Sequence, residues 1–100
     1  MLNIQKSLEN DRALLRLEGR LDTVTAPELQ QALDQLLPET AELTLDFGAL
    51  DYISSAGLRV LLTAQKQMNR KAGSMELVGV KKEILEVFEV TGFADILTIR

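Results

Sequence analysis

Segments with the two-residue hydrophobic period of a strand alternate along this chain with segments that have the 3.6-residue period of a helix. Ala13, Leu15 and Leu17, for example, occupy alternate positions and predict a strand with one more apolar face. The predicted strands lie around Ile4 and over residues 12–18, 42–47, 75–78 and 96–99. The polar run SLENDR predicts a hairpin between the first two. Regular alternation after that hairpin requires crossover connections, and therefore predicts an α/β fold with a largely parallel sheet.

The predicted helices cover residues 25–37, 55–72 and 82–90. Thr25 and Glu28 fit a capping box at the start of the first helix, and Pro38 lies just beyond its end. Gly73 is expected to supply the left-handed turn that ends the second helix. The basic second half of that helix suits the negative end of the helix dipole.

The residue types that are missing exclude several kinds of function. Without cysteine the chain has no disulfides or thiolate sites, and without histidine it lacks the usual general base and the commonest metal ligand. A net charge of -4 disfavours binding to nucleic acid, which needs a basic surface. No apolar run is long enough to span a bilayer, so a cytoplasmic protein without membrane insertion is expected. The small size and acidic charge predict a single domain, a monomer, and a protein or a small molecule as its partner.

Two adjacent serines in the stretch DYISSAGLRVLL are the most site-like feature of the chain. Catalysis by Ser54 or Ser55 is disfavoured, because the chain has S-S-A-G in place of G-x-S-x-G and no histidine to act as a base. No nucleotide-binding fingerprint is present, so no cofactor is expected. Asp22, Asp46 and Asp51 are interpreted as turn or strand-end acids, and no metal site is predicted.

At the start of a predicted helix, the two serines have two further interpretations. A serine side chain can cap the helix by accepting a hydrogen bond from a free N–H group. A serine there can also carry a phosphoryl group, because the free N–H groups and the helix dipole stabilise negative charge. The residues alone leave both interpretations open for Ser54 and Ser55.

Three stretches of the sequence together resemble the STAS domain family, and in particular the bacterial anti-sigma factor antagonists. They are GRLDTVTAPEL at residues 19–29, LDFGALDYISSAGLRVLL at residues 45–62 and KKEILEVFEVTGFADIL at residues 81–97. The resemblance covers nearly the whole chain and implies a single STAS domain over residues 1–100. It also implies the STAS fold, an α/β fold in which a mixed, mostly parallel sheet of about five strands is covered by helices mainly on one face.

The resemblance further implies a non-enzymatic role in transcription regulation by partner switching. The unphosphorylated antagonist binds an anti-sigma factor that is also an ATP-dependent serine kinase with a histidine-kinase-like fold, and thereby frees a sigma factor. The kinase phosphorylates one serine of the antagonist, the complex separates, and a PP2C-type phosphatase restores the active form. An alternative within the family is a regulatory or structural subunit of a stressosome-like or lipid-transport ATPase complex.

The family pattern D-S-[ST]-G-L implies which serine receives the phosphoryl group. Aligned on Gly57 and Leu58, the pattern places the acceptor on Ser55 and the family's aspartate on Ser54. Ser54 departs from the pattern, so it remains the alternative acceptor and a member of the implied partner-binding set.

Four other residues belong to this implied partner-binding set. Asp22 and Thr23 match the early loop that lies beside the phosphorylation site in the family, although Asp22 fits a cap or turn role equally well. Arg59 is assigned to partner contact or to pairing with a phosphate, with a solvated role as the alternative. Gly57 is expected to serve close backbone approach or the geometry of the helix start.

Overall fold

Five strands form one mixed sheet in a computed structural model that describes residues 1–100. They are β1 (Leu2–Glu9), β2 (Arg12–Leu21), β3 (Glu42–Ile53), β4 (Ser74–Val78) and β5 (Thr98–Ile99), in the order β1-β2-β3-β4-β5. β1 runs antiparallel to β2, and all the other neighbours are parallel. The predicted α/β class with a mixed, mostly parallel sheet of about five strands is therefore confirmed.

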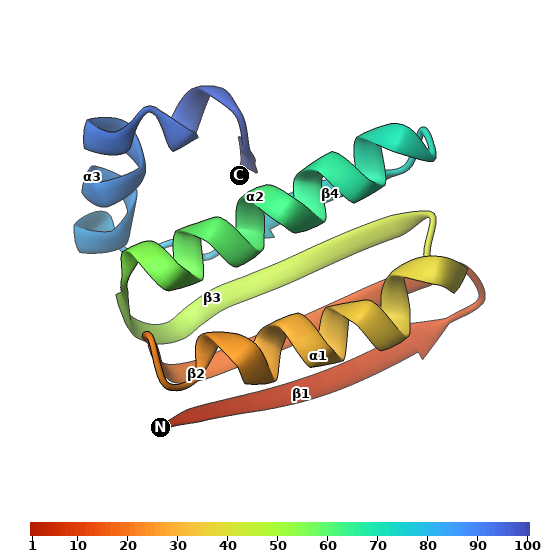
Figure 1. Cartoon of the computed structure of the whole chain (residues 1–100), viewed down its shortest axis with the longest axis horizontal. Helices are drawn as coiled ribbons and strands as arrows, with labels where there is room; N and C mark the ends of the chain where they lie inside the picture. Colours follow the sequence, from red (N-terminus) through yellow and green to blue (C-terminus); the bar gives the residue numbers. More distant parts are fainter.

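Two of the three helices lie side by side across one face of this sheet (Figure 1). The helices are α1 (Ala26–Leu36), α2 (Ser55–Arg70) and α3 (Lys82–Thr91). α1 follows β2 and α2 follows β3, as crossover connections between parallel strands require. α3 stands at one end of the sheet, near the start of α2 in the view of Figure 1. The prediction that helices cover mainly one face is confirmed, and the other face of β2, β3 and β4 has no helix over it.

The hydrophobic core lies between the sheet and its helices. Leu15, Leu45 and Leu77 occupy matching positions on three neighbouring parallel strands, and all three are fully buried. Full burial of each such side chain contributes about 1.5–3 kcal/mol. The largest fully buried side chains are Phe47, Phe88, Leu15, Leu17, Leu21, Leu29, Leu33, Leu43, Leu45, Leu50, Leu61 and Met68.

The two central strands are longer than the sequence predicts. β2 continues past Glu18 to Leu21, and β3 continues beyond the predicted residues 42–47 through the stretch GALDYI to Ile53. Leu21 and Ile53 are register partners, after two register shifts that interrupt the ladder. This extension carries the end of β3, and with it the two serines, to the edge of the sheet where the β2–α1 loop also lies.

The turn of the hairpin and the last strand are both shorter than predicted. β1 continues to Glu9, so the SLENDR run is mostly strand, and the turn is made by Asn10 and Asp11. Asn10 adopts a positive φ of 59°, a conformation that asparagine tolerates better than most residues. Near the C-terminus, a 3-10 turn over Phe93–Asp95 takes up part of the chain, and only Thr98–Ile99 pair with β4.

The prediction for the end of α2 is wrong both in its last residue and in the residue that makes the left-handed turn. The helix ends at Arg70, and Ala72, with a φ of 58°, adopts the left-handed conformation that was expected of Gly73. Gly73 serves packing instead, because a Cβ there would lie 2.8 Å from the carbonyl oxygen of Ala41. The close approach joins the end of α2 to the start of β3.

Candidate functional site

Ser54 connects the end of β3 to the start of α2 and is held by its backbone. Its N–H donates to the carbonyl of Leu21 at 2.9 Å, and its own carbonyl accepts a hydrogen bond from the N–H of Leu58 at 3.0 Å. The Ser54 side chain makes no cap hydrogen bond, and its Oγ is buried without a hydrogen-bond partner. The interpretation that the Ser54 side chain caps α2 is therefore wrong, and the Ser54 hydroxyl is shielded from solvent.

Ser55 is the first residue of α2 and is exposed. The first turn of α2 contains no acidic residue, so its free N–H groups and the positive end of the helix dipole are not neutralised from within the helix. An exposed hydroxyl at such a position is accessible to a large phosphate donor. A phosphoryl group attached there would meet favourable electrostatics on its own chain.

Gly57 brings the start of α2 against the sheet. A Cβ on Gly57 would lie 2.7 Å from Cγ of Leu21 and 3.0 Å from Cγ1 of Ile53, closer than side-chain carbons approach. The expected close backbone approach is therefore present. Because Gly57 is buried, it has no side chain to offer a partner and acts through packing.

Asp22 organises the loop between β2 and α1. Its Oδ1 accepts hydrogen bonds from the N–H groups of Thr25 at 3.0 Å and Val24 at 3.1 Å. The Thr25 hydroxyl turns back to donate to the carbonyl of Arg20 at 2.8 Å, and it accepts from the N–H of Asp22 at 2.9 Å. The predicted capping box of Thr25 and Glu28 is therefore wrong, because no side chain caps the start of α1 and the Thr25 hydroxyl is already used within the loop.

The Asp22 hydrogen bonds give the loop a defined pH dependence. The bond from the Thr25 N–H is the main cause that holds the pKa of Asp22 below its ordinary value of 3.8. A carboxylate with a lowered pKa in the folded state stabilises the fold above its unfolded pKa, and this contribution is lost as the pH falls through and below 3.8.

Replacing Asp22 by asparagine should remove this pH dependence while keeping a side-chain oxygen in place. As the pH drops below about 4, we expect the free energy of unfolding to fall more steeply in the wild type than in Asp22→Asn. The difference in this free energy between the two proteins should therefore become smaller. Urea unfolding followed by circular dichroism over a series of pH values measures this difference. Parallel curves for the two proteins would contradict the assignment of the lowered pKa to Asp22.

A shallow groove between the starts of α1 and α2 brings two of the predicted residues together. Thr23 and Arg59 line it, and both are exposed. Sequence reasoning did not include Gln30 of α1 and Thr63 of α2, which line the same groove. The spacing of four between Arg59 and Thr63 was the available signal for the α2 side, whereas nothing in the sequence indicates that Gln30 faces α2.

The three aspartates considered in the sequence do not converge. The Asp46 carboxylate lies 3.3 Å from the guanidinium of Arg16, and that of Asp51 lies 2.6 Å from the ammonium of Lys81. Asp22 lies in its own loop, 3.7 Å from Arg20. No group of three or more His, Cys, Asp or Glu side chains is placed to hold a metal ion. None of the helices has the length and apolar character to cross a membrane.

Comparison with known proteins points to one family. Residues 3–100 match the family model described as STAS domain. The chain is 39% identical over 84 residues to BtrV of Bordetella bronchiseptica, to which the role of an anti-sigma factor antagonist is attributed; the match covers 83% of this chain and 72% of that protein. It is 30% identical over 94 residues to the anti-sigma-B factor antagonist of Bacillus subtilis, covering 94% of this chain and 85% of that one.

The fold is similar to that of SpoIIAA in two solved forms. The anti-sigma factor antagonist SpoIIAA in its unphosphorylated form superposes with a TM-score of 0.78 at 16% identity, over 100% of this chain and 87% of that one. The phosphorylated form of SpoIIAA from Bacillus gives a TM-score of 0.79 at 17% identity, over 98% of this chain and 91% of that one. At this identity the likeness establishes a common fold.

Proposed function

The chain belongs to the STAS domain family, and we propose that it works as an anti-sigma factor antagonist that is switched by phosphorylation of Ser55. In its unphosphorylated form it binds an anti-sigma factor that is also a serine kinase, and thereby frees a sigma factor. The single observation that carries the choice of residue is the contrast between the exposed Ser55 and the buried, unpartnered Oγ of Ser54.

In this role the chain is the substrate of a phosphoryl transfer that other proteins catalyse. The Ser55 hydroxyl oxygen attacks the terminal phosphorus of ATP held by the kinase, its proton passes to a base of the kinase, and ADP leaves. A phosphatase of the PP2C type then hydrolyses the phosphoserine. This chain contributes by presenting the Ser55 hydroxyl to the kinase in a fixed position. The close packing of Gly57 and the backbone hydrogen bonds of Ser54 hold the start of α2 in place.

A constitutive subunit of a larger complex is the alternative that the family allows. Such a subunit uses the same surface for docking without a phosphorylation cycle. The named relatives support the antagonist, because both are described as anti-sigma factor antagonists. SpoIIAA, which shares the fold, has been solved with and without its phosphoryl group. Neither observation favours the constitutive subunit.

The first test is the transfer of phosphate to single-serine variants. With Mg-ATP and the cognate anti-sigma factor kinase, we expect one phosphate on the wild type, one on Ser54→Ala and none on Ser55→Ala. Intact-protein mass spectrometry counts the phosphates, and peptide fragmentation locates them. Ser54→Ala is a matched control, because it removes a buried hydroxyl that has no hydrogen-bond partner and should leave the fold unchanged.

Two outcomes would contradict the proposal in different ways. If Ser55→Ala is phosphorylated as fully as the wild type while Ser54→Ala is not, the acceptor is Ser54. If the wild type forms a stable complex with a partner but receives no phosphate from that partner and Mg-ATP, the constitutive subunit is the better description.

A further inference from the structure

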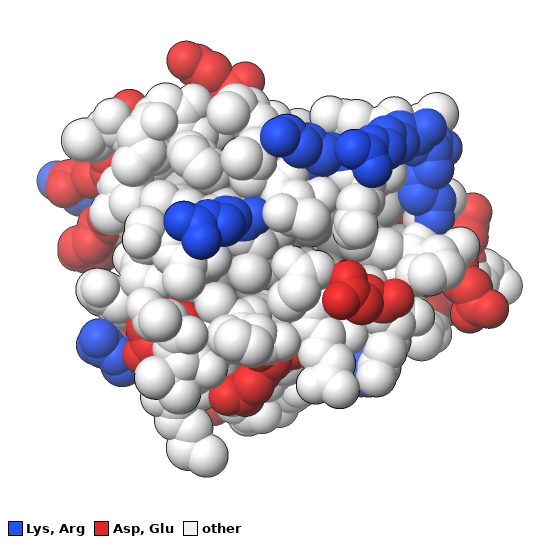
Figure 2. All heavy atoms as spheres, in the orientation of Figure 1, with Lys and Arg blue, Asp and Glu red and all other residues white.

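One side of α2 carries a row of positive charges that begins at Ser55. Arg59, Lys66 and Arg70 follow Ser55 at spacings of 4, 11 and 15 residues, and all four are exposed. At 3.6 residues per turn these positions fall within an arc of about 60° on the helix surface. Figure 2 shows blue side chains that follow the course of α2. We name Arg59, Lys66 and Arg70 the α2 basic stripe.

The charges of the α2 basic stripe have no partners within the chain. None of its three cations lies within ion-pair distance of a carboxylate, although the protein has 15 acidic residues against 11 basic ones. No aspartate or glutamate occurs anywhere in α2. The helix dipole explains only Arg70, the single basic residue of the last turn, because its effect falls off within that turn. Helix stability therefore does not account for Arg59 and Lys66.

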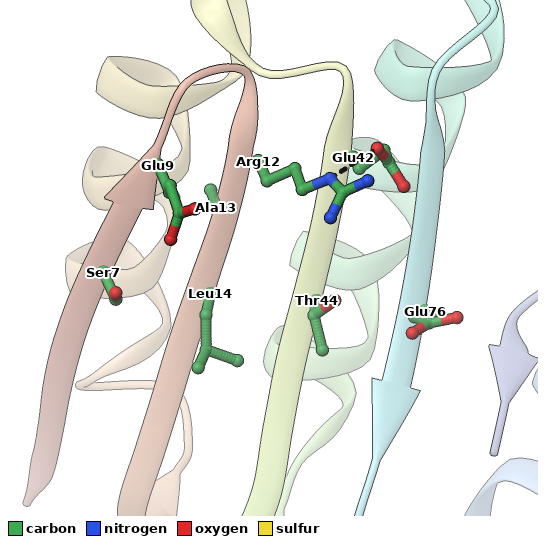
Figure 3. Close-up of a pocket in the computed structure, with 8 residues that line it drawn as sticks. All are labelled: Ser7, Glu9, Arg12, Ala13, Leu14, Glu42, Thr44 and Glu76. Atoms are coloured by element: carbon green, nitrogen blue, oxygen red, sulfur yellow. Dashed lines mark hydrogen bonds and ion pairs between the residues drawn. The ribbon is translucent and has the colours of Figure 1, made fainter.

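The uncovered face of the sheet shows the opposite arrangement. Figure 3 shows a hollow on that face in which the Arg12 guanidinium reaches Glu42 on the neighbouring strand, at 3.0 Å. Arg16 pairs in the same way with Asp46. The arginines of that face are thus matched with carboxylates of the same chain, whereas the cations of α2 are left available to another molecule.

We infer that the α2 basic stripe docks an acidic surface of the anti-sigma factor, with Ser55 at one end of the contact. The inference rests on the proposed function and names the chemistry of the partner. For a protein of net charge -4, an acidic partner is repelled overall and attracted along a surface such as this one. Charge complementarity of this kind fixes the orientation of two proteins and speeds their encounter.

The same arrangement explains why phosphorylation separates the partners. A phosphoryl group on Ser55 adds about two negative charges at the end of a stripe with three positive ones. It lies one helical turn from Arg59, within reach of that guanidinium, and therefore competes with the partner's carboxylates for it. It also repels those carboxylates directly. If the partner surface were basic, the phosphate would strengthen the complex instead.

Charge reversals on the stripe test the inference. We expect Lys66→Glu to raise the Kd for the cognate anti-sigma factor about fivefold, and Lys66→Glu with Arg70→Glu to raise it about thirtyfold. Lys6→Glu is the matched control, because Lys6 is exposed on β1 at the far edge of the sheet and makes no ion pair. It should change the Kd less than about twofold. Isothermal titration calorimetry measures all four proteins, and thermal unfolding verifies that each is folded.

Measurements at different salt concentrations, and binding tests with DNA and with anionic vesicles, separate the possible outcomes. Raising the salt from about 50 mM to about 300 mM should weaken binding by the wild type about tenfold and binding by the double variant much less. If the wild type binds tightly, and neither salt nor the charge-reversal substitutions change the Kd, the inference is overturned and the proposed function is unaffected. Absence of wild-type binding would overturn the proposed function, and this inference with it. Equally tight, stripe-dependent binding of a 20-base-pair DNA duplex or of phosphatidylglycerol vesicles would overturn the assignment to an acidic protein.

Discussion

Protein that carries phosphoserine at position 55 is expected to bind its anti-sigma factor more than about a hundredfold more weakly than the unmodified protein. The exposed Ser55 hydroxyl is small and neutral, and it fits into a protein interface without a charge to desolvate. A phosphoryl group brings about two charges that the interface must pair or strip of water, and an unpaired buried charge costs several kcal/mol. A loss of about 3 kcal/mol already corresponds to this change in affinity.

This result can be obtained without the kinase. Phosphoserine introduced at position 55 during translation gives uniformly modified protein, and titration calorimetry against the anti-sigma factor gives both dissociation constants. Phosphoserine at position 7 is the matched control, because Ser7 is exposed on β1, on the uncovered face of the sheet. Ser55→Ala should bind within about threefold of the wild type, and Ser55→Asp should fall between the wild type and the phosphoprotein. Equal weakening by phosphoserine at positions 7 and 55 would mean that overall charge, not position, controls binding.

The order of strands and helices could be predicted because it depends on local periodicity. Leu15 and Leu17 on one face of β2 belong to short-range patterns that a single sequence displays. The stretch that contains Ser55 could be found for the same reason, since helix starts have local signals. The side of the sheet that the helices cover came from the family resemblance, not from these patterns.

What could not be predicted depends on contacts between distant parts of the chain. The burial of the Ser54 Oγ follows from the pairing of β3 with β2, in which the Ser54 N–H bonds to Leu21, 33 residues earlier. The absence of the predicted capping box depends on the return of the Thr25 hydroxyl to the carbonyl of Arg20. The availability of Arg59 and Lys66 depends on where the carboxylates of the other elements lie, which no helical pattern reveals.

Replacement of Gly57 by valine is expected to lower the free energy of unfolding by about 3 kcal/mol. The first carbon of the new side chain would lie 2.7 Å from Cγ of Leu21, so either α2 must move away from the sheet or Leu21 must leave its rotamer. The higher helix propensity of valine relative to glycine offsets only a few tenths of a kcal/mol. Urea unfolding monitored by circular dichroism measures the loss. Gly48→Ala is the control, because only the flexible Asp46 carboxylate lies near its Cβ, and it should change stability by less than about 0.5 kcal/mol.

A double-mutant cycle with Leu21 decides whether this contact is the cause. Leu21→Ala alone should cost about 2–5 kcal/mol, because Leu21 is fully buried. Adding Gly57→Val to Leu21→Ala should then cost at least about 1 kcal/mol less than it does in the wild type, since the valine fills space that the leucine has left. Additive losses would show that the two side chains do not compete for one site. Because α2 begins at Ser55, two residues before this contact, Gly57→Val alone should also lower the phosphorylation of Ser55, and the double variant should regain it. Such a result would link the packing of the fold to the presentation of the proposed acceptor serine.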